Sequence, residues 1–373
     1  MQKPLKELGT QIHAFYRGNF GQNPPADSDS FGLEIELEGL GGEHWTEFSE
    51  KLPKLEGWRT VEDGSLRDGV EFVSNGPRPY SVLRDDLQHL SGTFTKLGFT
   101  PVFSFRTSLH VHMNAMHLSW RDVLKIYILY IIFERHLMEM GGAERQGNVH
   151  CLGAELAQRT IDDLREALQA DIKVGGFNRY GDPINTSFAH EVAAVTDRGR
   201  RYAAFNFASL PTHGTIEFRN HRGTADTDTV MAWVDTLRAM RDYATSAVQT
   251  PIELLKRFST LGEQAFAVEV FGQGSPIAVA VTQKPGETHT GMRLAQEIAF
   301  ARTNWDTKAA PKPKVKKEIV DSYSEAVANF NDIDWAAFEQ REEVRRVRQN
   351  VQRFEFNQWA LRPAQVGPIN NGN

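Results

Sequence analysis

Cysteine is almost missing from this sequence, since Cys151 is the only one among 373 residues. One thiol cannot form an intrachain disulfide, so the fold must be held by its core alone. A chain without disulfides suits a reducing compartment. We therefore expect a cytoplasmic protein.

Long apolar runs are also missing. The longest is Ile126–Phe133, which lies between Lys125 and Glu134 and is far too short to span a bilayer. The first 18 residues lack the apolar core of a secretory signal. We expect no membrane partner.

The charge balance and the loop motifs argue against two further classes. The formal net charge of -6 gives no indication of nucleic-acid binding. No Walker A sequence and no GxGxxG fingerprint occur, so these two phosphate-binding loops are ruled out. With 24% charged and 40% hydrophobic residues, the chain reads as a soluble globular protein of one large domain with an appendage, or of two domains.

The rest of the chain is organised around an acidic segment, FGLEIELEG, at residues 31–39. Three glutamates alternate there with three aliphatic residues, and this period of two predicts a β-strand with one apolar and one acidic face. Glutamate is a poor strand former, and carboxylates that share a face repel one another. The row therefore indicates either a solvated outer face or a binding site for a divalent cation.

Three further strands are expected to have apolar residues on one side and polar residues on the other. The polar residues are Glu71 in strand 70–74, His110 and His112 in strand 103–113, and Glu217 and Arg219 in strand 214–220. A sheet whose front collects carboxylates, imidazoles and a guanidinium, and whose back packs on helices, has the construction of a site.

The other expected elements cover most of the chain up to residue 263. They are strands at 58–61 and 201–210, the latter in a hairpin with 214–220, and helices at 44–55, 80–97, 120–140, 160–170, 227–247 and 251–261. The middle of helix 120–140, IYILYIIF, is apolar all round, which predicts a buried helix behind the sheet. The expected organisation is an N-terminal extension (1–30), a main domain (31–263), a poorly defined extension (264–311) and a charged linker with a helical tail (312–373).

Carboxylates combined with one or two imidazoles are the ligand set of Mg²⁺ or Mn²⁺. Two or three such ions can bridge the phosphates of a nucleotide, while arginines stabilise the charge that develops on transfer. Simpler interpretations also exist. Glu217 and Arg219 could form a surface ion pair, Glu62 and Asp63 could be turn residues, and Arg201 could extend along the core edge.

Seven short motifs follow one another in a specific order. They are Gly32-x-Glu34-x-Glu36, Glu62-Asp63-Gly64-Ser65, Glu71-x-Val73-Ser74, Leu109-His110-Val111-His112, Arg145 after the long helix, Arg201-Tyr202-x-x-x-Asn206, and Thr215-x-Glu217-Phe218-Arg219. In this order the chain resembles the amidoligase family of phages and bacteria, over roughly residues 30 to 245. That family belongs to the carboxylate–amine ligase superfamily, with glutamine synthetase and glutamate–cysteine ligase. Where the family often has Cys-Gly before its His-x-His, this chain has Thr107-Ser108, at positions that we do not expect to touch metals.

The resemblance implies an α+β fold like the glutamine synthetase catalytic domain: a curved, mainly antiparallel sheet with helices on its convex face and the site on its concave face. It also implies a chemistry, in which ATP with Mg²⁺ or Mn²⁺ phosphorylates a carboxylate and an amine then attacks to give an amide. The residues that it assigns are Glu34, Glu36, Glu71, His110 and Glu217 to metal, Arg201 and Arg219 to phosphates, and His112, Arg145 and Asn206 to further cofactor contacts.

Several alternatives stay open from the sequence. The carboxylate that takes the proton from the amine could be Glu62, Asp63 or Glu71. A metal-dependent hydrolase or phosphatase could use the same carboxylates, and a phage structural or interaction protein could have the fold without the activity. The expected partners are an amine and a small-molecule, peptide or protein carboxylate, and the sequence identifies neither.

Overall fold

The computed structural model describes residues 5, 27–39, 55, 57–169, 176–177, 183–184, 187–196, 201–302 and 305. All of them lie within one compact unit of the chain. Nearly all of the N-terminal extension, the expected helix at 44–55 except residue 55, and the linker and tail at 312–373 lie outside the described residues.

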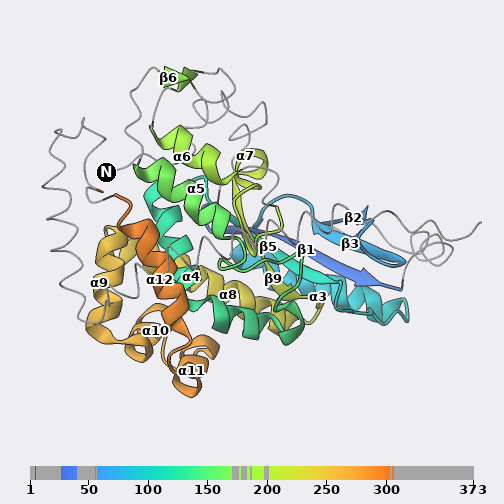
Figure 1. Ribbon diagram of the computed structural model, residues 1–373. Coiled ribbons are helices and arrows are strands. Elements are labelled where there is room, and N and C mark those ends of the chain that lie inside the picture. Colours follow the sequence, from blue (N-terminus) through green and yellow to red (C-terminus); the bar gives the residue numbers. More distant parts are fainter. Residues whose placement is uncertain are drawn as a thin grey trace, which may run out of the picture. The chain divides into compact units, whose positions relative to one another are not determined.

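The central element is an open, antiparallel seven-stranded sheet, so the α+β class is confirmed (Figure 1). Six strands follow one another in space, and β4 (Arg78–Pro79) pairs with the start of β1. The order is β2 (Trp58–Glu62), β3 (Gly69–Ser74), β1 (Ser30–Glu38), β5 (Ser108–Asn114), β9 (Thr215–Arg222) and β8 (Phe205–Asn206). The four strands expected to carry polar residues are therefore neighbours in the middle of the sheet.

The apolar side of these strands faces helices, as the alternation predicts. Ile35, Phe72, Val111 and Phe218 are fully buried. The covering helices are α3 (Tyr80–Lys96), α4 (Trp120–Gly141) and α8 (Thr227–Ser246). Edge-on or tilted ring contacts join Phe72 to Phe94 of α3 and Phe218 to Tyr130 of α4. We call this the back face of the sheet, and the opposite, polar side the front face.

Helix α4 begins and ends where its sequence indicates. Ser119 accepts from the backbone N–H of Asp122, and Asp122 accepts from that of Ser119, which satisfies two N–H groups of the first turn. The helix is buried over most of its length, including Lys125, whose ammonium donates to the carbonyl of Val248 at 2.7 Å. Both observations agree with the predicted buried helix.

Two expected strands are shorter than predicted. Strand β5 begins only at Ser108, because residues 103–107 form a turn in which the Thr107 hydroxyl donates to the carbonyl of Ser104 at 2.9 Å. The expected strand 201–210 is reduced to Phe205–Asn206, which pairs with β9 as a hairpin. It ends early because Leu210–His213 form the short helix α7.

The region after residue 263 is helical, although its sequence signal is weak. Beside α9 (Pro251–Leu261) it contains α10 (Glu263–Phe271), α11 (Pro276–Gln283) and α12 (Thr288–Ala299). Helix α12 packs closely on α4, where a Cβ added at Gly291 would lie 2.0 Å from the carbonyl of Ile131. The remaining elements are α5 (Gln158–Gln169), α6 (Ser187–Val195) and a small β6 (Gly176–Phe177) and β7 (Pro183–Ile184) pair.

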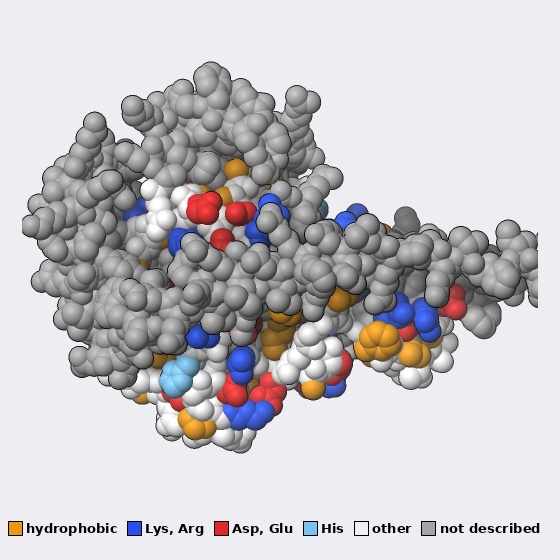
Figure 2. Space-filling model, viewed as in Figure 1, with side chains coloured by type: hydrophobic (Ala, Val, Ile, Leu, Met, Phe, Trp, Pro, Cys, Tyr) orange, Lys and Arg blue, Asp and Glu red, His pale blue; other side chains and the backbone are white. Residues whose placement is uncertain are grey.

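None of the described helices has the length and apolar character needed to cross a bilayer. On the face shown in Figure 2, Lys and Arg side chains lie beside Asp and Glu side chains. Charges of both signs are thus mixed on the described part of this face.

Candidate functional site

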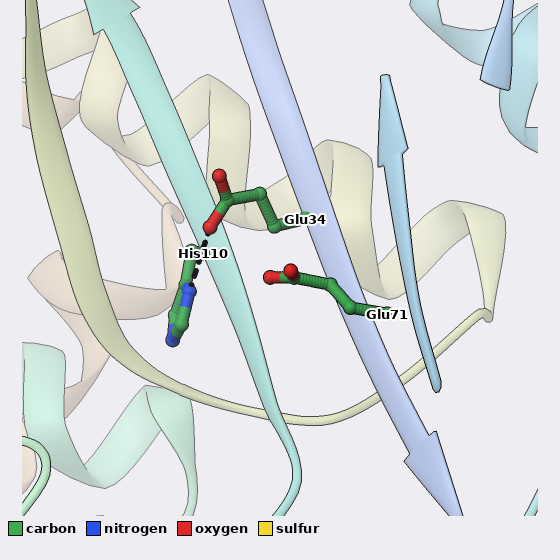
Figure 3. A group of neighbouring side chains, drawn as sticks. All are labelled: Glu34, Glu71 and His110. Atoms are coloured by element: carbon green, nitrogen blue, oxygen red, sulfur yellow. Dashed lines mark hydrogen bonds and ion pairs between the residues drawn. The ribbon is translucent and has the colours of Figure 1, made fainter. Parts of the chain in front are cut away.

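The register of the central strands brings the predicted ligands together on the front face. Glu36 of β1 pairs with Glu71 of β3, and Glu34 pairs with His110 of β5. Further along, His112 pairs with Glu217 of β9. Figure 3 shows Glu34, Glu71 and His110 pointing toward one another from three strands, with helices behind the sheet.

Glu34 is the centre of this group because each of its oxygens meets a different histidine. Its Oε2 lies 3.0 Å from Nδ1 of His110, and its Oε1 lies 3.2 Å from Nε2 of His112. The His110 side chain is 3% exposed and that of Glu34 is 25% exposed. The carboxylate therefore sits at the mouth of the site, with the imidazoles beneath it.

The charges of this group are strongly interdependent. Burial alone would raise the pKa of Glu34, but the charge of His112 and the hydrogen bond from His110 outweigh it and hold the pKa well below its usual range. Burial would lower the pKa of His112, yet the charge of Glu34 raises it overall. The neighbouring groups thus keep Glu34 ionised, which is the form that binds a cation.

Glu71 is in the opposite situation. Burial, followed by the charges of Glu34 and Glu36, raises the pKa of Glu71 to about 9. Glu71 is thus a third carboxyl group beside two others, and among the described residues the charges that act on it are those of other acids. Its protonation relieves that repulsion, and a divalent cation would relieve it equally well.

Glu36 is held by the residue at the start of β5. The backbone N–H and the hydroxyl of Ser108 donate to Oε2 of Glu36 at 2.7 and 2.5 Å. The same hydroxyl lies 2.8 Å from Nε2 of His110. Ser108 therefore orients two candidate ligands, a role that the sequence did not indicate.

The β9 end of the site combines an acid with a guanidinium. Arg219 donates to Oε1 of Glu217, and Asn206 of β8 donates to Oε2 of Glu217 at 2.7 Å. Burial would raise the pKa of Glu217, but the charges of Arg219 and His112 lower it. Both oxygens of Glu217 are thus directed by their partners, and Arg219 is the positive charge on this side.

Two sets of three side chains have ligand atoms close enough to share one ion. The first is Glu34, Glu71 and His110, the second is Glu34, His112 and Glu217, and within each set the atoms lie within 4.8 Å of one another. Glu34 is common to both. Glu36 is adjacent through its 3.7 Å approach to Nε2 of His110.

Three other predicted residues lie outside this cluster. Arg201 is exposed, and its guanidinium stacks 4.7 Å from the ring centre of Tyr202 and donates to the Tyr202 hydroxyl. Arg145 is buried, and it donates to the backbone carbonyl of Arg219 at 2.9 Å. Asp63 accepts from the N–H of Ser65 at 2.7 Å, in a turn close enough for its charge to raise the pKa of Glu71. The side chain of Glu62 lies outside the described ones.

Several residues support the cluster in roles that the sequence analysis did not assign. Besides Ser108, the Thr215 hydroxyl lies 3.0 Å from Nδ1 of His112, and the ring of His213 packs edge-on against His112 at 5.9 Å. The carbonyl of His150 accepts from Nε of Arg219 at 3.4 Å. Only Thr215 gave a signal, because it is two residues before Glu217 and so shares its strand face.

Comparison with known proteins agrees with these motifs. No curated protein matches the chain. Residues 69–241 match the model of a family described as "Putative amidoligase enzyme". That range includes Glu71, His110, His112, Glu217 and Arg219, but it begins after the glutamates of β1. Residues 69–241 are therefore similar to the amidoligase family, as the motifs indicated, and this similarity suggests a ligase-type enzyme.

Proposed function

We propose that this protein is an ATP- and Mg²⁺-dependent ligase that joins a carboxylate to an amine on the front face of a glutamine synthetase-like sheet. The observation that carries the proposal is the pair of ligand sets that share Glu34, with Arg219 beside them. A shared carboxylate between two sets is suited to two ions on one polyphosphate.

The residues fit Mg²⁺ or Mn²⁺ by their chemistry. Glu34, Glu71 and His110 would hold one ion, and Glu34, His112 and Glu217 would hold a second, with Glu36 adjacent. The carboxylate oxygens are hard ligands, and thiolates take no part. When bound, such ions neutralise phosphate charge and align it for transfer.

Arg219 is the residue that we assign to the transferring phosphoryl group. Its guanidinium now pairs with Glu217, so an ion that takes up the Glu217 charge would free it for another anion. A guanidinium offers a planar fork to two phosphate oxygens. In the proposed reaction a carboxylate oxygen of the substrate bonds to the γ-phosphorus and ADP leaves. The amine nitrogen then bonds to the carbonyl carbon, and phosphate leaves.

The amine must lose a proton when it attacks, and we assign that proton to Asp63. Glu71 is used as a ligand in this scheme, whereas Asp63 lies near it and stays outside both ligand sets. One oxygen of Asp63 accepts from the turn at Ser65. The other would be available to the amine as a general base.

The test is ADP release in the presence of Mg²⁺, screened over pools of carboxylic acids, amino acids, peptides and amines. A ligase should form ADP only when both an acid and an amine are present. ADP or phosphate release without an amine would instead support the hydrolase interpretation.

Glu34→Gln should abolish release, because it weakens both ligand sets, while Glu253→Gln on α9 serves as a control. No ADP with any pair, and no stabilisation by ATP with Mg²⁺, would contradict the proposal.

A further inference from the structure

Arg145 is a buried charge with an unusual set of contacts. It ends the short 3-10 turn Ala143–Arg145 that follows α4, and it is 1% exposed. Among the described residues no carboxylate forms an ion pair with it. An unpaired buried charge is costly, so the hydrogen bonds that this guanidinium makes should matter more than its charge.

Its hydrogen bond completes the edge of strand β9. The N–H of Arg219 donates to the carbonyl of Ala204 at 2.9 Å, just beyond the short strand β8. The carbonyl of Arg219 accepts from Nη2 of Arg145 at 2.9 Å. A side chain thus takes the position that a longer β8 would have filled, and a charged donor makes this bond stronger than an ordinary backbone bond.

The segment around Cys151 lies beside Arg145 and is itself held by backbone hydrogen bonds. The N–H of Leu152 donates to the carbonyl of Tyr202 at 2.7 Å, and the N–H of Ala204 donates to that of Leu152 at 2.8 Å. This segment carries Cys151, a buried thiol beside the guanidinium. Burial raises the pKa of Cys151 to about 11, and the charge of Arg145 opposes that rise. The thiol therefore stays neutral and acts as packing for Arg145.

A second contact joins α4 to the next residue of β9. A Cβ added at Gly141 would lie 2.1 Å from the carbonyl of Asn220, so the end of α4 touches the strand backbone directly. Gly141 and Arg145 thus hold two successive residues of β9, Asn220 and Arg219. The strand backbone cannot shift there unless the end of α4 shifts as well.

We infer that Arg145 is a positioning residue for Arg219, which fixes the backbone from which the phosphate-binding side chain extends. The consequence for nucleotide binding rests on the proposed function, whereas the contact itself does not. The sequence had placed Arg145 at the cofactor. Its burial indicates instead that it acts through Arg219.

The experiment compares Arg145→Met, Arg145→Lys and a matched control, Arg241→Met. Arg241 is also buried, but it lies on α8, where it pairs with Asp29. Each variant is studied by NMR of the arginine Nε–H groups, with the Arg219 signal assigned from Arg219→Lys, and by calorimetric titration with ATP and Mg²⁺. Melting temperatures show how much stability each variant loses.

Arg145→Met should shift the Arg219 signal and weaken ATP–Mg²⁺ binding by about 10–100-fold, the usual effect of removing a residue that orients a ligand-binding group. Arg145→Lys, which keeps one donor, should show smaller changes. Arg241→Met should lower the melting temperature and leave both readouts unchanged. An unmoved Arg219 signal in both Arg145 variants would overturn the inference. If the wild type binds no ATP–Mg²⁺, the proposed function fails, and the NMR result alone decides the role of Arg145. If Arg145→Met does not fold, the comparison of Arg145→Lys with the wild type decides that role.

Discussion

The guanidinium of Arg219 lies against the carboxylate of Glu217, two residues earlier on the same face of β9. One residue is a candidate metal ligand and the other a candidate phosphate ligand. Each therefore neutralises the other, and in the proposed function a cation and an anion would take their places. This pairing links the two halves of the site, and it suggests that metal and nucleotide bind best together.

Magnesium binding should release a proton at pH 7. Because the pKa of Glu71 is raised to about 9, this carboxyl carries its proton at pH 7 in the absence of metal, and it must lose that proton to bind Mg²⁺. The buffer takes up the released proton, and PIPES and Tris have different heats of ionisation. Titration calorimetry at pH 7 should therefore give different binding heats in the two buffers.

Glu71→Gln is the control for this measurement, since it cannot release the proton. Its binding should be weaker, and its heats in the two buffers should differ less than those of the wild type, because only His112, whose pKa is also raised, would still release a proton. Equal heats for the wild type in both buffers would mean that Glu71 is not a metal ligand.

Ser108→Ala should weaken Mg²⁺ binding without unfolding the protein. The hydroxyl orients both Glu36 and His110, and loss of such a supporting group costs about 10–100-fold in metal affinity. The backbone N–H of Ser108 would still hold Glu36, so we expect the loss of stability to be only about 1 kcal/mol. Ser246→Ala is the control, because its hydroxyl donates to the carbonyl of Asp242 on the exposed surface of α8. Equal Mg²⁺ affinity in the two variants would rule out this role.

The alternation of residues was enough to predict which side chains share a face, but not which of them meet. Glu34 could have faced several residues of β5. The pairing that sets it opposite His110, and His112 opposite Glu217, depends on strand register and on an irregularity between Leu109 and Val111. Register is a property of the whole sheet, so the two ligand sets could not be derived from spacing alone.

Other features lacked a local signal. Helices α10 and α11 are short, and glycines lie between them, so their sequences carry too little periodicity to be recognised. Arg201 stacks on its own neighbour Tyr202. Arg145 donates to a backbone carbonyl of β9 that is left unpaired by a strand only because β8 is short. For Arg145 a tertiary contact decides where the guanidinium goes, whereas Arg201 lies against the residue next to it in the chain.

The stability of the protein should fall as pH rises from about 5 to 8, in part because of Glu134. Burial raises the pKa of this carboxyl to about 8, against an ordinary value of 4.5. In that window the unfolded chain has lost the proton while the folded protein keeps it, so the free energy of unfolding decreases with pH. Glu134 also lines a cavity of about 470 Å³, and solvent there limits the effect to about 1–2 kcal/mol.

Glu134→Gln should remove this part of the pH dependence. The amide oxygen can still accept from the N–H of Ala154, which donates to the carboxylate at 2.8 Å. Urea unfolding at pH 5 and pH 8 should therefore show a smaller difference for the variant than for the wild type. The same slope in both proteins would show that Glu134 is already ionised at pH 5.

Arg219→Lys tests the phosphate role while keeping the charge. A lysine can still pair with Glu217, so an ion pair that served only stability would survive the change, at a cost of about 0–1 kcal/mol. An ammonium cannot form the two parallel hydrogen bonds of a guanidinium with a phosphate. If Arg219 stabilises the transferring phosphoryl group, kcat should fall by roughly 10²–10³, or about 3–4 kcal/mol, with little change in melting temperature.

Arg238→Lys provides a matched control for that measurement, because Arg238 lies on α8, behind the sheet, and forms an ion pair with Asp29. It should leave kcat unchanged. Near-normal kcat in Arg219→Lys, together with a drop in melting temperature, would make Arg219 a structural partner of Glu217. In that case Arg219 would not be the cation that supports phosphoryl transfer, and the reaction proposed for the site would have to be abandoned.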